Sequence, residues 1–143
     1  FPLVLCTVRE VGHYSCRSMT GNCAALQSLA DEPGRVQMNP ADADERGIAE
    51  GQLVWVRSRR GKVITRASIS ERINAGAIYM TYQWWIGACN ELTQDNLDPI
   101  SRTPETKYCA VQLEAIEDQR WAEDFAACAY QTMKTRLIAA VNV

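Results

Sequence analysis

The chain has 143 residues, of which 47% are apolar and 22% are charged, and its formal net charge is −2. This length fits one domain with a core of its own. The small negative charge argues against a general nucleic-acid surface or an anionic-membrane surface, and no run approaches the roughly 18 apolar residues of a membrane span. Any anion site must therefore be local.

Six segments rich in β-branched and aromatic residues are predicted as strands. They are residues 1–6, 35–38, 52–58, 62–69, 77–82 and 108–113. Residues 52–69 form the clearest hairpin, with a turn at Arg59, Arg60 and Gly61. The chain enters its first strand at once, without an initiator Met or a signal peptide, so we expect a fragment of a longer protein or a processed chain.

Helices are predicted between and after these strands. Residues 23–30 form a short helix that ends before Pro33 and Gly34. Asn39 is placed to cap a second helix, which starts at Pro40 and ends at Gly47. Residues 96–106 are predicted as an extended loop. In residues 117–141 apolar side chains recur with helical spacing, at Trp121, Phe125, Cys128 or Ala129, Met133, Leu137 and Val141.

These elements favour a compact β-barrel with helical decoration. The last helix is expected to cover the barrel or a neighbouring domain. Strict strand–helix–strand alternation is absent from the sequence, and so are the glycine motifs of dinucleotide-binding Rossmann domains and P-loop proteins.

The cysteines bear on metal binding and on the redox compartment. They are Cys6, Cys16, Cys23, Cys89, Cys109 and Cys128. No two have the Cys-x-x-Cys spacing and His13 is the only histidine, so we expect no metal site built within this chain. Several cysteines lie in apolar runs, which favours free, mostly buried thiols in a cytoplasmic protein.

Residues 7–16 carry the densest set of functional groups. Arg9 can bind a diphosphate through two parallel hydrogen bonds, and backbone N–H groups of an irregular loop can add anion contacts. His13 can hydrogen-bond the edge of a heterocycle. Two alternatives stay open: a surface loop with an ordinary histidine, and a nucleophilic Cys16 with His13 as its base.

Residues 79–90 form a second candidate region, with aromatic side chains leaving a strand and entering a glycine-containing turn. Tyr82 can face a flat ring by stacking or through its hydroxyl group, and Gln83 can do so through its amide. The alternative is that Trp84 and Trp85 are core or interface residues, which we expect of at least one of them.

A third candidate region is the polar stretch of residues 90–107. Lys107, directly before the last strand, is a candidate for a buried anion contact. The alternative is an ordinary solvated loop lysine.

Taken in order, these three regions resemble the C-terminal molybdopterin-dinucleotide-binding domain of the dimethyl sulfoxide reductase family of molybdenum enzymes, and within it the formate dehydrogenases. The family pattern has Arg-x-x-x-His after the first strand, then Asn-x-Leu-Thr, Asp-Pro-x-Ser and Pro-Glu-aromatic-Lys. Here these are Arg9 with His13, then residues 90–93, 98–101 and 104–107. Thr106 departs from the pattern, because the family usually has Tyr or Phe there. Residues 82–84 also differ from the Phe-His common in related formate dehydrogenases.

The resemblance implies a mainly β fold: a six-stranded double-psi β-barrel with short peripheral helices and a C-terminal helix. Residues 1–116 would form the barrel, and residues 117–143 a helix packed on the same domain. The implied cofactor is a pair of molybdopterin guanine dinucleotides holding molybdenum or tungsten. The metal ligand from the protein and the iron–sulfur cluster would lie in other domains, and electron-transfer subunits would be partners.

The resemblance implies cofactor contacts from residues 7–16, Tyr82, Asn90 and Lys107, to which side-chain chemistry adds Gln83. The full candidate set is Thr7, Val8, Arg9, Glu10, Val11, Gly12, His13, Tyr14, Ser15, Cys16, Tyr82, Gln83, Asn90 and Lys107. Arg9, Ser15 and Lys107 suit diphosphates, whereas His13, Tyr14, Tyr82, Gln83 and Asn90 suit pterin or guanine edges.

The implied function is to bind and orient this cofactor in an enzyme that oxidises formate to carbon dioxide, with no catalytic or metal-ligating residue in this chain. One alternative is the same domain of another family oxidoreductase, such as a nitrate reductase. The other is a cofactor-free barrel that holds a protein partner.

Overall fold

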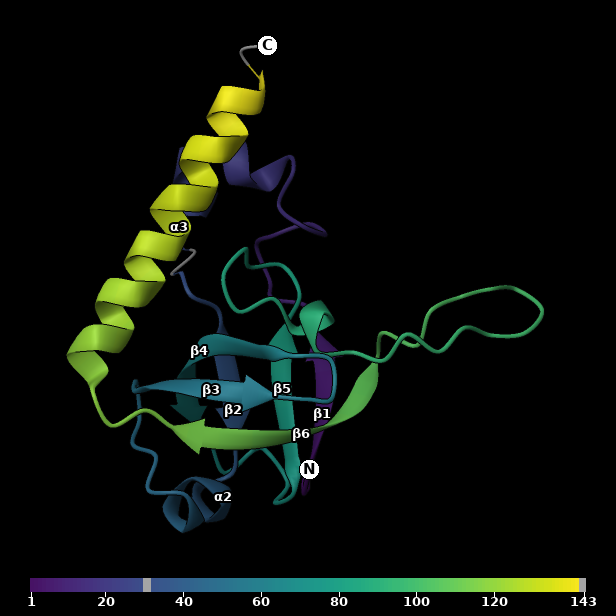
Figure 1. The fold of residues 1–143 in the computed structure, drawn as a ribbon, viewed down its shortest axis with the longest axis vertical. Helices are drawn as coiled ribbons and strands as arrows, with labels where there is room; N and C mark the ends of the chain where they lie inside the picture. The colour runs from purple at the N-terminus through teal and green to yellow at the C-terminus, as the bar shows by residue number, and fades with distance from the viewer. Residues whose placement is uncertain (30–31, 142–143) are drawn as a thin grey trace.

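A computed structural model of the chain describes residues 1–29 and 32–141, with the side chains of residues 137, 138, 140 and 141 left out. Six strands in this part of the chain close into a barrel in the order β1-β5-β2-β4-β3-β6 (Figure 1). Their bounds are β1 Leu3–Val8, β2 Arg35–Met38, β3 Leu53–Arg57, β4 Lys62–Ile69, β5 Ala77–Thr81 and β6 Tyr108–Ala115.

The barrel mixes parallel and antiparallel pairs. β1 lies parallel to β5 and β2 parallel to β4, while the other four neighbours are antiparallel. Parallel neighbours need long crossover connections, so both parallel pairs join strands that are far apart in the sequence. The predicted closed, six-stranded and mainly β fold is confirmed.

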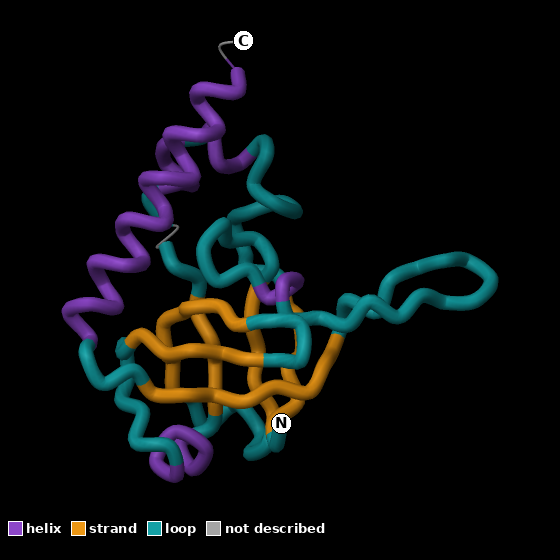
Figure 2. Tube along the Cα trace, in the orientation of Figure 1, coloured by secondary structure: helices purple, strands orange, loops and turns teal. Residues whose placement is uncertain are grey.

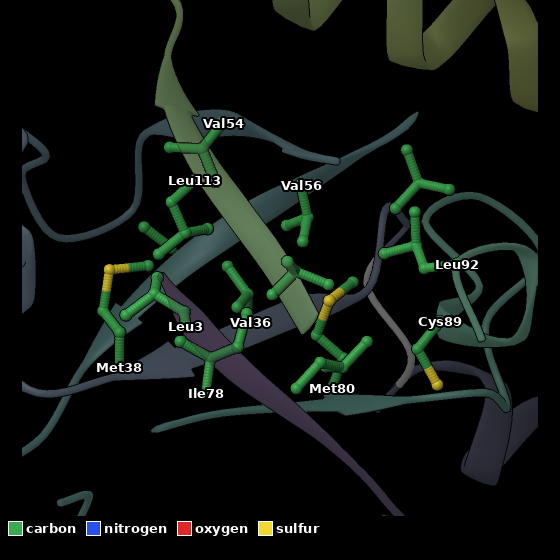
Figure 3. Close-up of a cluster of buried hydrophobic side chains, with 14 of the residues drawn as sticks. Leu3, Val36, Met38, Val54, Val56, Ile78, Met80, Cys89, Leu92 and Leu113 are labelled. Carbon is green, nitrogen blue, oxygen red and sulfur yellow. The ribbon is translucent and has the colours of Figure 1, made fainter. Parts of the chain in front are cut away.

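The barrel interior is filled by side chains from every strand. In β6, for example, Cys109, Val111 and Leu113 point inward while their neighbours stay exposed or half-buried, as the period of two in a strand requires. Figure 3 shows the resulting cluster, in which aliphatic and Met side chains from opposite walls meet. Because the interior is packed with side chains, a ligand must bind at the rim or outside the barrel.

Three α-helices and two 3-10 helices accompany the strands in the described residues. They are η1 Thr20–Asn22, α1 Ala24–Gln27, α2 Pro40–Glu45, η2 Cys89–Glu91 and α3 Gln119–Val141. The predicted cap of α2 is confirmed, because the Asn39 side chain accepts a hydrogen bond from the Ala41 N–H at 2.9 Å.

The first half of α3 packs on the barrel, and its second half extends past the barrel (Figure 1). Ala122 and Ala126 are buried against Leu53 and Ile64. At its start, the Gln119 side chain bonds both backbone groups of Leu53, accepting at 2.7 Å and donating at 2.9 Å. The predicted helix that covers the barrel is therefore present, although the predicted positions at Leu137 and Val141 lie outside the described side chains.

Some predicted boundaries were wrong. β1 continues to Val8, so Thr7 and Val8 are strand residues and not loop residues, because β1 pairs with β5 as far as Thr81. The helix predicted at residues 23–30 covers only α1, and Ala30 lies outside the described residues. α3 begins at Gln119 because the Asp118 carboxylate accepts a hydrogen bond from the Trp121 N–H at 2.9 Å.

The thiol prediction was also partly wrong. All six cysteines lie within the described residues and none forms a disulfide. Only Cys89 and Cys109 are buried, whereas Cys16, Cys23 and Cys128 are exposed. The exposed ones lie on the loop after β1 and on α3, outside the barrel core.

Two long irregular regions dominate the outside of the barrel. Because β1 and β5 are parallel, the residues that follow them start from the same end of the barrel, which we call the loop end (residues 9–20 and 82–90; Figure 2). Residues 94–106, which we call the finger, project from the barrel between η2 and β6 (Figure 1).

Candidate functional site

At the loop end, three hydrogen bonds join the residues after β1 to those after β5. The Arg9 Nε group donates to the Tyr82 hydroxyl oxygen at 2.7 Å. The Glu10 N–H donates to Gln83 Oε1, and Gln83 Nε2 donates to the His13 carbonyl oxygen at 2.7 Å. The structure thus brings together the predicted residues Arg9, Glu10, His13, Tyr82 and Gln83.

Arg9 keeps its charge facing outward. The side chain is exposed, and its hydrogen bond to Tyr82 raises the pKa of Arg9 above its ordinary value. In the described part of the chain, its two terminal nitrogens have no hydrogen-bond partner. Those nitrogens can donate side by side to two oxygens of an anion, which is the geometry expected of a diphosphate site.

His13 is fixed at one ring nitrogen and unpartnered at the other. Its Nδ1 lies 2.9 Å from Thr20 Oγ1, which also accepts from the Tyr14 N–H at 3.2 Å. Its ring meets Trp84 edge-on, with centroids 5.4 Å apart. Among the described residues, the buried Nε2 atom has no hydrogen-bond partner. Buried polar atoms are normally satisfied, so a ligand atom or an ordered water is needed there.

A polar pocket of about 450 Å³ lies beside Arg9 and Glu10. Its wall includes Gln37, Ser68 and Trp84. Burial raises the pKa of the Glu10 carboxyl group, and the nearby positive charge of Arg35 partly offsets this rise. A half-buried carboxylate of this kind is stabilised by N–H donors, such as those on the edge of a nitrogen-rich ring.

Gln83 is placed differently from its predicted role. Its side chain is 0% exposed, and its Oε1 accepts from both the Glu10 N–H and the Thr81 hydroxyl group. The amide therefore bonds the chain itself and does not face outward.

The tip of the loop is open. Val11, Gly12, Tyr14 and Cys16 are exposed and Ser15 is half-buried. Gly12 has a φ of +97°, which favours glycine, and a Cβ there would meet nothing within 4 Å among the described atoms. The tip can therefore lie close against a ligand. In the same part of the chain, no hydrogen bond joins Cys16 to His13, so the nucleophile alternative gains no support.

Lys107 lies next to the end of β1, because the Thr7 N–H donates to its carbonyl oxygen at 2.9 Å. Its side chain is exposed on the rim, because β6 pairs with β1 only from Tyr108 onward, and its contact with an anion stays a prediction. Asn90 is exposed on η2, and within the described residues no hydrogen bond joins it to Arg9 or His13.

The sequence analysis missed three residues that organise this end. Thr20 holds His13 and Tyr14, and Arg17 and Glu32 form an ion pair. No helical or strand periodicity marks these three residues, because each acts through a specific side-chain contact, between 6 and 66 residues away in the sequence.

Comparison with known proteins identifies the family. Residues 3–110 match the family described as “Molydopterin dinucleotide binding domain”. The chain belongs to this family. It is 66% identical over 137 residues to formate dehydrogenase H of Escherichia coli, covering 96% of this chain and 19% of that protein.

More distant relatives include other oxidoreductases. The chain is 40% identical to F420-dependent formate dehydrogenase 2 subunit alpha of Methanococcus maripaludis, over 81% of this chain and 17% of the relative. It is 34% identical to a periplasmic nitrate reductase of Desulfovibrio desulfuricans, over 79% of this chain and 15% of the relative. The chain thus spans less than a fifth of the length of each of these three relatives.

The fold is shared with a solved structure of low sequence similarity. Acetylene hydratase from Pelobacter acetylenicus matches with a TM-score of 0.63 at 18% identity, over 80% of this chain and 18% of that one. Within the described residues, no helix has the length and apolar character needed to cross a membrane. The same residues contain no cluster of three or more His, Cys, Asp or Glu side chains suited to a metal ion.

Proposed function

We propose that this chain binds and orients molybdopterin guanine dinucleotide as the C-terminal domain of a cytoplasmic enzyme that oxidises formate to carbon dioxide. The observation that carries the proposal is the 66% identity to formate dehydrogenase H over nearly the whole chain. In this proposal residues 1–116 are the cofactor-binding barrel and residues 117–143 belong to the same domain. Other domains of the enzyme and electron-transfer subunits are its partners.

The residues of the loop end fit such a cofactor. The unpartnered His13 Nε2 atom, the outward nitrogens of Arg9 and the open backbone at Gly12 are groups that a phosphorylated, nitrogen-rich ligand can use. When bound, a pair of these dinucleotides would hold molybdenum or tungsten and supply the redox chemistry, together with the iron–sulfur cluster of another domain.

Each group of this chain would have a binding task. Arg9, with Ser15 on the loop and Lys107 on the adjacent rim, would bind the diphosphate oxygens. His13, Tyr14, Tyr82 and Asn90 would hydrogen-bond or stack on ring edges. Glu10 would repel phosphate, so we assign its carboxylate to ring N–H donors.

Nitrate reduction is the second candidate, and its support is the 34% identity to a nitrate reductase. The formate reaction is favoured because the identity to formate dehydrogenase H is nearly twice as high. The alternative of a cofactor-free barrel that holds a protein partner would be supported by exposed Trp84 and Trp85, but Trp84 is only 4% exposed.

The first test is the composition of the full-length protein, purified without oxygen. Acid treatment should release about two GMP per molybdenum or tungsten atom, since each dinucleotide carries one guanosine. Oxidation of formate, but no reduction of nitrate, should follow in the same preparation. A protein without metal and without GMP would contradict the proposal.

The diphosphate roles have a sharper test. Arg9→Ala and Lys107→Ala in the full-length protein should each lower metal and GMP content, since a lost charge-assisted contact costs about 1.5–3 kcal/mol. The matched control is Arg59→Ala, an exposed arginine in the β3–β4 turn. Equal GMP content in all three variants would refute the assigned contacts.

A further inference from the structure

Arg17 is a fully buried arginine just behind the loop tip. Its side chain is 1% exposed, its Nε donates to the Gln83 carbonyl oxygen at 2.8 Å, and its Nη2 pairs with the Glu32 carboxylate. The guanidinium plane also contacts two aromatic rings, with Cζ 4.5 Å from the centroid of Trp84 and 4.7 Å from that of Trp85. One planar cation therefore binds four groups at once.

Glu32 extends this arrangement to the backbone after β5. Its Oε1 accepts from the Trp85 N–H at 3.3 Å, and its Oε2 accepts from the Ile86 N–H at 3.0 Å. The Arg17–Glu32 pair, which we call the clamp, thus fixes the turn formed by residues 83–86. The Glu32 carboxylate thus joins the guanidinium group to two backbone N–H groups.

The turn held by the clamp is the one that carries the loop. The Gln83 amide bonds Glu10 and His13, and the Trp84 ring meets His13 edge-on. The Trp85 indole N–H donates to the Cys16 carbonyl oxygen at 3.4 Å. The clamp therefore reaches the loop through residues 83–85, and also directly, because the Arg17 N–H donates to the Tyr14 carbonyl oxygen at 2.9 Å.

Two features of Arg17 in the clamp are energetically unfavourable. Arg17 has a φ of +64°, which is unfavourable for a residue with a side chain. Within the described residues, its buried Nη1 group has no hydrogen-bond partner. Strained and unsatisfied groups of this kind are typical of functional sites, where geometry is maintained at the expense of stability.

We propose that Arg17 and Glu32 are positioning residues that set the geometry of Arg9, Glu10 and His13 for the dinucleotide. This inference rests on the proposed function. Arg17 itself is too deeply buried to touch a ligand, so it acts through the turn and the loop. A lysine cannot replace it, because an ammonium group lacks the planar set of donors that binds Glu32 and Gln83 while stacking between two rings.

The test compares Arg17→Lys and the milder Glu32→Gln in the full-length holoenzyme. The matched controls are Arg57→Lys and Glu114→Gln, which alter the pair formed at 3.8 Å by the exposed Arg57 and the half-buried Glu114 on the barrel wall. Two quantities are measured on folded protein: hydrogen–deuterium exchange of the loop peptide, and the rate at which bound dinucleotide is lost, read as GMP in the filtrate.

Both clamp variants should speed exchange at Glu10 and Tyr14, leave the exchange of β1 unchanged, and raise the rate of dinucleotide loss about tenfold. The controls should stay within about twofold of the parent protein. Faster exchange with unchanged dinucleotide loss would overturn the inference, because the clamp would then be purely structural. Unchanged exchange would overturn it as well.

The two proposals fail in different ways. A parent protein that contains no GMP contradicts the proposed function. A parent protein that contains GMP, with clamp variants that lose it at the parental rate, contradicts only the positioning role. If Arg17→Lys does not fold, the Glu32→Gln variant decides, because it preserves the size of the side chain and one of its acceptor oxygens.

Discussion

The loop end and the finger look alike in sequence, since both are polar stretches between strands, yet they are held in different ways. The loop end is held by side chains that bond partners 66 to 73 residues away, as Arg17, Gln83 and Arg9 do. The finger is held by its own residues, such as the Asp98 N–H, which donates to the Thr103 carbonyl oxygen at 3.0 Å, and the bridge between Leu97 and Pro104.

This difference indicates different mechanical roles. A loop fixed by distant partners keeps its geometry only while the whole barrel end is intact, which suits a site where several groups must be aligned. The finger is fixed mainly by local bonds; at its base the Thr7 hydroxyl group of β1 donates to the Thr106 carbonyl oxygen at 2.9 Å, and its tip is open, with Ile100 93% exposed. Substitutions at the loop end should therefore affect the stability of the fold, and substitutions in the finger should not.

The largest loss of unfolding free energy is expected for Gly87→Ala at the loop end. Gly87 has a φ of +78°, and a Cβ there would lie 2.6 Å from the Ile64 carbonyl oxygen, a backbone atom that cannot move away easily. The variant should lose about 3 kcal/mol of unfolding free energy or more. Chemical unfolding followed by tryptophan fluorescence measures it.

The matched control for that variant is Gly61→Ala in the hairpin turn. Among the described atoms, nothing lies within 4 Å of a Cβ at Gly61, and its φ is not left-handed. Its unfolding free energy should change by less than about 0.5 kcal/mol. Equal losses in the two variants would show that the close packing of Gly87 on β4 does not matter.

A smaller but direct comparison of the two regions is Gln83→Ala against Asn96→Ala. Gln83→Ala leaves the Glu10 N–H and the His13 carbonyl without partners and opens a cavity, and should cost about 3 kcal/mol. Asn96→Ala removes one exposed bond to Glu105 and should cost less than about 0.5 kcal/mol. Similar losses in both variants would contradict the distinction drawn above.

The sequence predicted the parts of the molecule that have a local pattern. The alternation in residues 52–69 gave the hairpin, and Asn39 with Pro40 gave the start of α2, because both signals lie within a few residues. The family pattern placed Arg9 and His13 on the correct loop. Whether they contact the cofactor stays a prediction.

The clamp could not be predicted in this way. Arg17 reads as a turn residue, and nothing near it in the sequence indicates the ion pair with Glu32 or the contact with Trp84. The role of Gln83 could not be predicted from the sequence either. Its amide is suited to the edge of a ring, but in the closed barrel it bonds the backbone of the loop. Roles set by long-range contacts appear only once the fold is known.

The smallest expected effect concerns the tip of the finger. The Asp98 carboxylate accepts from the Ser101 N–H and hydroxyl group and from the Ile100 N–H. These bonds lower the pKa of Asp98 below its ordinary value of 3.8. The folded pKa is depressed, so the ordering of the tip is fully present above pH 3.8 and is lost only as the pH falls through the lower, folded value.

The protonation of Asp98 can be followed by NMR, in which the amide protons of Ile100 and Ser101 should shift with a midpoint below pH 3.8. At neutral pH, Asp98→Ala should increase tryptic cleavage after Arg102 about threefold, with no change in the unfolding of the barrel. Asp95→Ala, an exposed change at the base of the finger, is the control. If Asp98→Ala also weakened the barrel, the finger would be coupled to the fold, and its independence from the loop end would have to be abandoned.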